Sequence, residues 1–157
     1  ECEQEPDRVL ATILSVRSVE PVADQDVASK LGGLLQRETD WYRGRRLPSP
    51  DGELDAAFDG PARAVRCGVA IVESARRAGV SLAAGVHTGE CELHDGKIAG
   101  IAVSAGARVA SAAGPSEVLV SQTVKDLVAG SGIEFADRGE HELKGVGAWR
   151  LYSVVDV

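Results

Sequence analysis

The sequence predicts an α+β domain in which helices cover a mostly antiparallel sheet. The length of 157 residues and the hydrophobic content of 44% are typical of one globular domain with a proper core. Segments in which apolar residues recur at every second position alternate with segments in which they recur at helical spacing. The order is β-α-β-β-α-β, followed by further helices and strands. Turn signals such as Asp95-Gly96 join neighbouring strands directly. We expect residues 1–7 to be a linker and residues 8–157 to be the domain.

The first strand and the first helix are predicted from their apolar patterns. Residues 8–19 are mostly apolar on both faces of an extended chain, which is typical of a central strand covered on each side. Residues 23–42 have a helical period and predict an amphipathic helix. Its apolar stripe consists of Val27, Leu31, Leu34, Leu35 and Trp41.

An interrupted strand and a half-buried strand follow. Pro48 and Pro50 interrupt residues 43–50, because proline cannot donate to a sheet. The next strand alternates, with Leu54, Ala56 and Phe58 on its buried face. Pro61 then starts a helix that Gly79 closes.

The C-terminal half continues with strands and a helix of small residues. Residues 81–88 predict a buried strand, and residues 90–93 and 97–99 a hairpin. The helix after Gly100 has one small apolar face, and Gly114 is expected at its end with a positive φ. That face consists of Val103, Ala107, Ala110 and Ala113. A short helix at residues 122–129 is followed by closing strands at 133–135 and 149–155, with a polar hairpin between them.

Composition and charge exclude several classes of function. The net charge of −7 disfavours nucleic acid and anionic membranes as partners, and no apolar run reaches the roughly 20 residues of a transmembrane helix. The three cysteines form no CxxC pair, which favours a cytoplasmic location over a disulfide framework. The chain has no methionine, so we expect it to be fused to other domains in a longer protein. Its abundance of alanine, glycine and arginine indicates a bacterial source.

Two stretches carry a resemblance to a known family. They are GIAVSAGARVASAAGPSEVLVS at residues 100–121 and the ending GEHELKGV followed by WRLY. Over about residues 8–154 the chain resembles the class III adenylate/guanylate cyclase catalytic domain. The resemblance implies a ferredoxin-like βαββαβ core with additional C-terminal α/β elements.

The resemblance also implies where metal ions would bind. Class III cyclases hold two divalent cations on two aspartates, and these ions activate the ribose 3′-hydroxyl of ATP or GTP. In this chain Arg17 stands at the first aspartate position and Gly52 at the second, with Asp51 displaced by one residue. A slip of one residue would restore Asp51, but it would also turn the apolar residues of the following strand away from the core.

The remaining family positions are mostly replaced as well. Arg108 matches the arginine that stabilises the transition state, whereas Ser104 stands at the asparagine position. Pro48 and Lys97 stand at the two base-specifying positions. Of the family positions that we matched, only Arg108 keeps its residue.

These replacements favour a catalytically degenerate cyclase domain that serves as a regulatory or dimerisation module and needs no cofactor. We expect a homodimer, or a heterodimer with another cyclase domain. The alternative is a weak or atypical cyclase that uses Mg²⁺ or Mn²⁺ through Asp51, and a third hypothesis is a nucleotide sensor that uses Lys97 and Arg108 on phosphates. Two positions remain open for the Arg17 side chain: an ion pair with Asp51 or Glu53, or exposure in a widened cleft.

Overall fold

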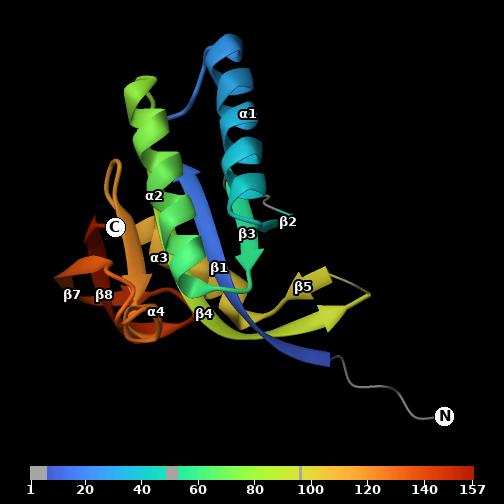
Figure 1. The fold of residues 1–157 in the computed structure, drawn as a ribbon, viewed down its shortest axis with the longest axis vertical. Coiled ribbons are helices and arrows are strands. Elements are labelled where there is room, and N and C mark those ends of the chain that lie inside the picture. The colour runs from blue at the N-terminus through green and yellow to red at the C-terminus, as the bar shows by residue number, and fades with distance from the viewer. Residues whose placement is uncertain (1–6, 49–52, 96) are drawn as a thin grey trace.

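The computed structural model describes residues 7–48, 53–95 and 97–157, and within them one sheet organises the chain (Figure 1). The strands run in the order β2-β3-β1-β4-β6-β8-β7, and β5 pairs with β4. The elements are β1 (Asp7–Ser18), α1 (Gln25–Trp41), β2 (Arg45–Leu47), β3 (Leu54–Phe58), α2 (Pro61–Arg77), β4 (Leu82–His94), β5 (Lys97–Ala99), α3 (Ile101–Ala112), β6 (Val118–Ser121), α4 (Gln122–Leu127), β7 (Glu134–Leu143) and β8 (Gly147–Asp156). The described helices include none with the length and apolarity that a bilayer span requires.

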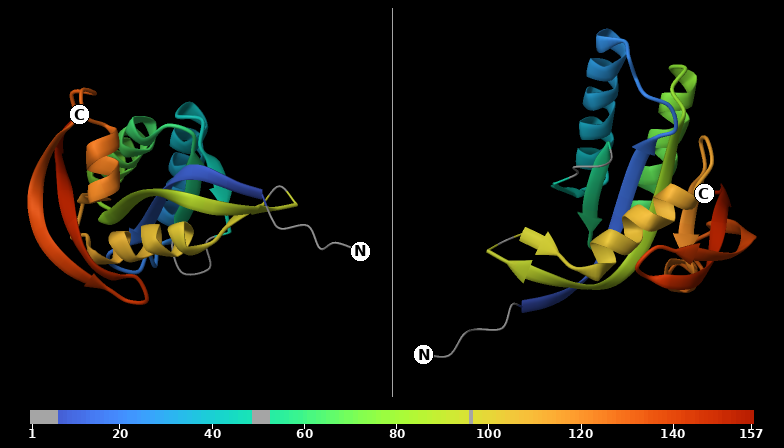
Figure 2. Two further views of the ribbon diagram at one scale, coloured as in Figure 1. Left: turned by 90° about the horizontal axis from the view of Figure 1, so that it is seen from below. Right: turned by 180° about the vertical axis from the view of Figure 1, so that it is seen from behind.

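The sheet is antiparallel-rich, as predicted, with β4 and β6 forming a parallel pair among the described strands. Helices cover both of its faces (Figure 2). On one face α1, α2 and α4 contribute to the largest apolar cluster, whereas α3 lies on the other face. The α+β architecture expected from the sequence is therefore confirmed.

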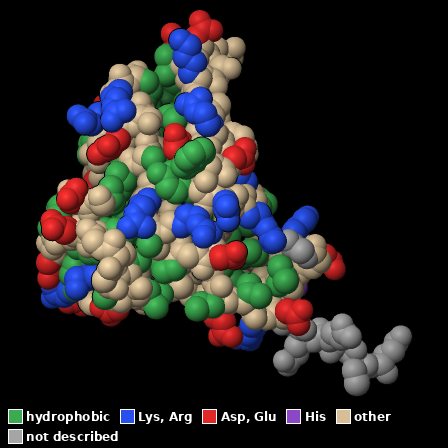
Figure 3. Space-filling view, in the orientation of Figure 1, with side chains coloured by type: hydrophobic (Ala, Val, Ile, Leu, Met, Phe, Trp, Pro, Cys, Tyr) green, Lys and Arg blue, Asp and Glu red, His purple; other side chains and the backbone are tan. Residues whose placement is uncertain are grey.

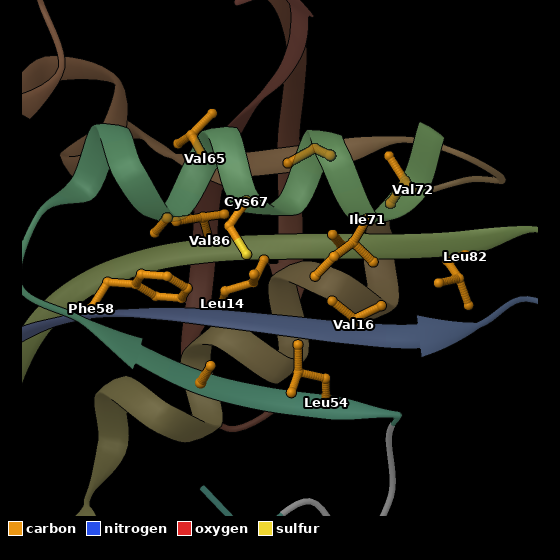
Figure 4. Packing of buried hydrophobic residues seen from close by; sticks show 14 of the residues in the cluster. Leu14, Val16, Leu54, Phe58, Val65, Cys67, Ile71, Val72, Leu82 and Val86 are labelled. Carbon is orange, nitrogen blue, oxygen red and sulfur yellow. The ribbon is translucent and has the colours of Figure 1, made fainter. Parts of the chain in front are cut away.

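β1 is the central strand that its two apolar faces predicted. It pairs with β3 on one side and β4 on the other. Leu14 and Val16 pack toward α2 with Ile71 and Val86 (Figure 4). Ile13 belongs to the cluster on the α3 side, and both Ile13 and Leu14 are fully buried. Successive side chains of β1 point to opposite faces of the sheet, so the strand packs against a layer of helix on each side.

α3 lies very close to the sheet, and two glycines make this approach feasible. A Cβ atom added to Gly85 on β4 would lie 2.2 Å from the backbone nitrogen of Ala110. A Cβ added to Gly106 on α3 would lie 2.9 Å from Ile13 Cγ2. The predicted small-residue helix is confirmed, but its buried face differs from the prediction: Val103 is half-buried and Ala107 is exposed. The residues of α3 that are buried are Ala102, Ala105, Gly106, Val109 and Ala110.

Some local predictions are wrong, and each error has a physical reason. Gly114 does not have a positive φ, because the backbone leaves the helix in an extended conformation at Ala113 (ψ 143°). The positive φ falls instead on Ser116 (φ 56°). Trp41 does not join the core, since the buried residues of α1 are Leu31, Leu34, Leu35 and Thr39, and the Trp41 side chain at the end of the helix is 79% exposed.

The closing hairpin is longer than its apolar residues indicated. β7 and β8 pair from Glu134 with Asp156 to Leu143 with Gly147, and a register irregularity lies between Asp137 and Glu140. The predicted polar hairpin is therefore strand for most of its length. β7 is an outer strand with mostly exposed side chains, so its pairing produces little of the period-two apolar signal that predicts a strand.

Candidate functional site

A cleft of about 280 Å³ opens between the sheet and the exposed side of α3. β1 and β3 supply one wall, α3 supplies the other, and Pro48 lies at the end of β2. The lining residues are Ser15, Val16, Arg17, Pro48, Asp55, Val103, Ser104, Ala107, Arg108, Ala110 and Ser111. This cleft brings together residues that are nearly a hundred positions apart in the chain.

Arg17 binds the C-terminal end of α3. Its Nε donates to the carbonyl oxygen of Ala110 at 2.9 Å, and its Nη2 donates to the carbonyl oxygens of Ser111 at 3.4 Å and Ala113 at 2.7 Å. The last carbonyls of a helix have no partners within the helix and carry its partial negative charge. A guanidinium group supplies N–H donors to these carbonyls and a positive charge beside them, so Arg17 links β1 to the end of α3.

The cleft contains one described carboxylate beside this cation. Ser15 Oγ donates a hydrogen bond of 2.5 Å to Asp55 Oδ1, and the two residues are direct partners in the pairing of β1 with β3. Ser15 is buried and Asp55 is half-buried. The carboxylate is therefore held against the sheet by a short hydrogen bond.

Arg108 and Ser104 lie one helical turn apart on the exposed side of α3. Within the described chain, the Arg108 side chain makes no hydrogen bond or ion pair. Ser111 also lines the cleft, but its Oγ donates to the carbonyl oxygen of Ala107 at 3.0 Å. Arg108 is thus a cation in the cleft whose N–H groups face solvent.

Solved structures with the same arrangement of elements share this fold. An adenylyl cyclase, CyaB from P. aeruginosa, is 21% identical with a TM-score of 0.84, over 98% of this chain and 97% of that one. An adenylate/guanylate cyclase/hydrolase from Silicibacter pomeroyi is 23% identical with a TM-score of 0.81, over 95% and 98%. The chain has the class III cyclase fold. No protein-family model and no curated protein matches the sequence.

Domains with the cyclase fold occur in more than one state of assembly. A guanylyl cyclase domain from the fungus Blastocladiella emersonii is described as dimeric; it is 14% identical over 96% of this chain and 98% of that one, with a TM-score of 0.79. An adenylate cyclase from Trypanosoma brucei is described in its monomeric state; it is 15% identical over 94% and 88%, with a TM-score of 0.80.

The structure brings some of the predicted cyclase positions together and separates one of them. Arg17, Ser104, Arg108 and Pro48 all line the cleft. Lys97 does not, because it begins β5 on the projecting hairpin, where it is exposed. Asp51 and Gly52 lie outside the described residues, so the predictions on the second aspartate position stay predictions.

The predicted ion pair between Arg17 and Glu53 is wrong. No such pair exists among the described residues, and the guanidinium binds the carbonyls of α3 instead. The pairing with Asp51 stays a prediction, because that residue lies outside the described ranges. The alternative, simple exposure in a widened cleft, is also wrong, because Arg17 is only partly exposed and its N–H groups have acceptors.

Sequence reasoning missed Asp55 and Ser15 as residues of the cleft. Both were read as ordinary positions in alternating strands. The available signal was the register: aligning the apolar residues of the two strands as antiparallel neighbours places Ser15 beside Asp55. Ala57 lies on the same face of β3 as Asp55, and it is buried in the apolar cluster between the sheet and α3.

The described residues of the cleft do not fit a pair of divalent cations. Within ranges 7–48, 53–95 and 97–157, no three side chains among His, Cys, Asp and Glu lie together as metal ligands. Asp55 is the one described carboxylate in the lining, and Arg17 places a permanent positive charge on the same wall. Hard divalent cations require several oxygen ligands, and a neighbouring guanidinium repels them.

His87 belongs to the buried part of β4, outside the lining of the cleft, and has a structural role. Its Nδ1 lies 2.8 Å from Ser121 Oγ, and its ring contacts Trp149 with centroids 4.6 Å apart. Burial lowers the pKa of His87 from 6.5 to about 4. The imidazole is therefore neutral in the folded chain at neutral pH.

This buried imidazole predicts a loss of stability in mild acid. Between pH values of about 6.5 and about 4, the unfolded chain binds a proton at His87 that the folded chain does not. This group should therefore leave the free energy of unfolding unchanged above pH 6.5 and lower it by about 3 kcal/mol as the pH approaches 4. Urea unfolding at several pH values measures this slope.

The matched variant is His87→Gln, whose slope over the same pH range should be smaller by that amount. Carboxylates whose pKa is changed by folding, such as Glu117, are common to both proteins and cancel in the difference. Equal slopes for the two proteins would show that His87 is protonated in the folded state.

Proposed function

We propose that the chain is a member of the class III cyclase family that has lost metal-dependent catalysis and acts as a regulatory or dimerisation module in cyclic-nucleotide signalling. The observation that carries the proposal is the position of Arg17. The residue that stands where the family has a metal-binding aspartate is bound through three hydrogen bonds to the end of α3.

The electrostatics of the cleft support this proposal. Formation of a cyclic nucleotide requires deprotonation of the ribose 3′-hydroxyl and neutralisation of the charge on the phosphates, and divalent ions supply both effects in the family. An arginine can neutralise charge, but at neutral pH it cannot accept a proton or ligate a metal ion. Arg17 therefore removes the means of activating the hydroxyl while it maintains the fold.

A cyclase assay tests the proposal. The purified chain is incubated with Mn²⁺ and ATP or GTP, and the formation of cyclic nucleotide is measured. We expect no product above the level of a blank without protein. Turnover that depends on Mn²⁺ and is abolished by Arg108→Ala would overturn the proposal.

The second candidate is a weak or atypical cyclase, favoured by Asp55. This carboxylate lies in the cleft with Arg108, so the cleft retains one acidic group and one cation of the kind that phosphoryl chemistry uses. In this alternative Asp51 and Mg²⁺ or Mn²⁺ would complete the site. The same assay with Asp51→Ala distinguishes it, because only this alternative predicts activity that the substitution removes.

We also propose self-association, or association with another cyclase domain, in a bacterial cytoplasm. The resemblance to domains that form dimers supports this, and so does the side of α3 that carries Ser104, Ala107 and Arg108, which are exposed among the described residues. Sedimentation velocity over a range of concentrations measures the assembly. A single species with the mass of one chain at every concentration would contradict self-association.

A further inference from the structure

We propose that a surface away from the cleft binds a carboxylate-rich segment of another protein. The surface consists of Trp41, Arg43, Arg45, Arg46, Arg63 and Arg66, and we call it the arginine–tryptophan surface. It lies at the end of α1, on β2 and on the first half of α2. The inference does not depend on whether the cleft is catalytic, because none of these residues lines the cleft.

The fold gathers these residues from three elements. Arg43 and Arg45 line a groove of about 330 Å³ together with Asp59, and Arg63 and Arg66 line a second hollow that begins at Gly60. Asp59, which lines the groove, and Gly60, which lines the hollow, are neighbours in the chain. Figure 3 shows Lys and Arg side chains in a row across the face on which α1 and α2 lie.

The arginines of this surface have few partners of opposite charge. Arg43, Arg46, Arg63 and Arg66 form no ion pair with a described carboxylate. Two of them bind neutral groups: Arg46 Nη1 donates to Gln36 Oε1 at 3.0 Å, and Arg66 Nη2 donates to the carbonyl oxygen of Ser131 at 3.0 Å. Arginines grouped in this way, on a chain with a net charge of −7, create a local positive field.

Exposed apolar groups lie beside these arginines. Trp41, two residues before Arg43, is 79% exposed although it is one of two tryptophans in the chain. The lining of the groove beside Arg43 and Arg45 also includes Leu10, which is 72% exposed, and Ile98. Tryptophan and arginine are the residues most enriched at the energetic centres of protein interfaces.

The chemistry favours an acidic protein segment over other anions. A guanidinium group binds a carboxylate through two parallel hydrogen bonds, and the apolar part of the groove lining can take a side chain between them. Nucleic acid and anionic membranes present a much denser negative charge, so the net charge of −7 opposes them more strongly than it opposes a short acidic segment. Glu38 and Asp59 also lie among the arginines and further disfavour a polyphosphate.

Fluorescence anisotropy with labelled peptides tests the proposal. The probe is a fluorescein-labelled peptide of glutamates and two leucines, and the control probe has glutamine in place of every glutamate. We expect the glutamate peptide alone to bind, with an affinity that falls as salt is raised. The double variant Arg43→Gln/Arg63→Gln and the single variant Trp41→Ala should each weaken binding about tenfold or more.

The matched control is Arg76→Gln/Arg77→Gln, which removes two exposed arginines from the other end of α2 and should change binding by no more than about twofold. Circular dichroism confirms that each variant is folded. The proposal is overturned if the glutamate peptide does not bind, if the glutamine peptide binds equally, or if the Arg43/Arg63 variant binds like the native chain. It is also overturned if a single-stranded oligonucleotide or a phosphatidylserine vesicle binds through these arginines while the peptide does not.

Discussion

Replacing Gly85 by alanine is expected to destabilise the domain by about 3 to 5 kcal/mol, enough to unfold many domains of this size. The added Cβ would lie 2.2 Å from the nitrogen of Ala110 and 2.7 Å from its Cα. Both are backbone atoms of α3, so no rotation of a side chain relieves the overlap. The helix would have to move away from β4, and the contacts that bury Val109 and Ala105 would be lost.

Urea unfolding and thermal melting followed by circular dichroism measure this effect. The matched control is Gly33→Ala in α1, where no atom lies within 4 Å of an added Cβ. Alanine is favoured over glycine inside a helix, so this control should be neutral or stabilise by up to about 1 kcal/mol. An unchanged midpoint for Gly85→Ala would show that α3 does not lie on β4 at this position.

Replacing Arg17 by alanine is expected to lower the free energy of unfolding by about 2 kcal/mol. The substitution removes three hydrogen bonds to the carbonyls of Ala110, Ser111 and Ala113 and takes a cation from the negative end of α3. The position is partly exposed, so water replaces some of what is lost. Arg17→Asp should be more destabilising still, because a carboxylate would face carbonyl oxygens.

The comparison variant for Arg17 is Arg77→Ala. Arg77 forms an exposed ion pair of 4.0 Å with Glu73 one helical turn away, and its loss should cost less than about 0.5 kcal/mol. Equal midpoints for Arg17→Ala and the native chain would show that the contact with α3 does not stabilise the fold. If Arg17→Asp were more stable than the native chain only when Mn²⁺ is added, a metal ion would be taking the place of the guanidinium.

Much of the fold could be predicted because its signals are local. The two apolar faces of β1 required helices on both sides, and the small residues of α3 required a close approach to the sheet. The exposure of Trp41 could not be predicted in the same way. Helical period places that residue beside the stripe, but only the position of the sheet decides where the stripe ends.

The residues of the cleft were predicted in part. Arg108, Ser104 and Pro48 were identified through resemblance, and the structure places all three in the lining. The partner of Arg17 was not predictable, because every residue has a backbone carbonyl and the sequence does not show which carbonyls a side chain reaches. Asp55 was missed because its significance arises from strand register, which joins residues 40 positions apart.

Binding of manganese tests the central claim most directly, because that claim concerns metal ions rather than turnover. The electron paramagnetic resonance signal of free Mn²⁺ is followed as the chain is added in the presence of a GTP analogue that cannot be cyclised, and the nucleotide alone serves as reference. The account predicts that the chain binds no manganese beyond the amount held by the nucleotide. Two additional ions bound for each cleft, displaced by Mg²⁺ and lost on Asp55→Asn, would contradict it.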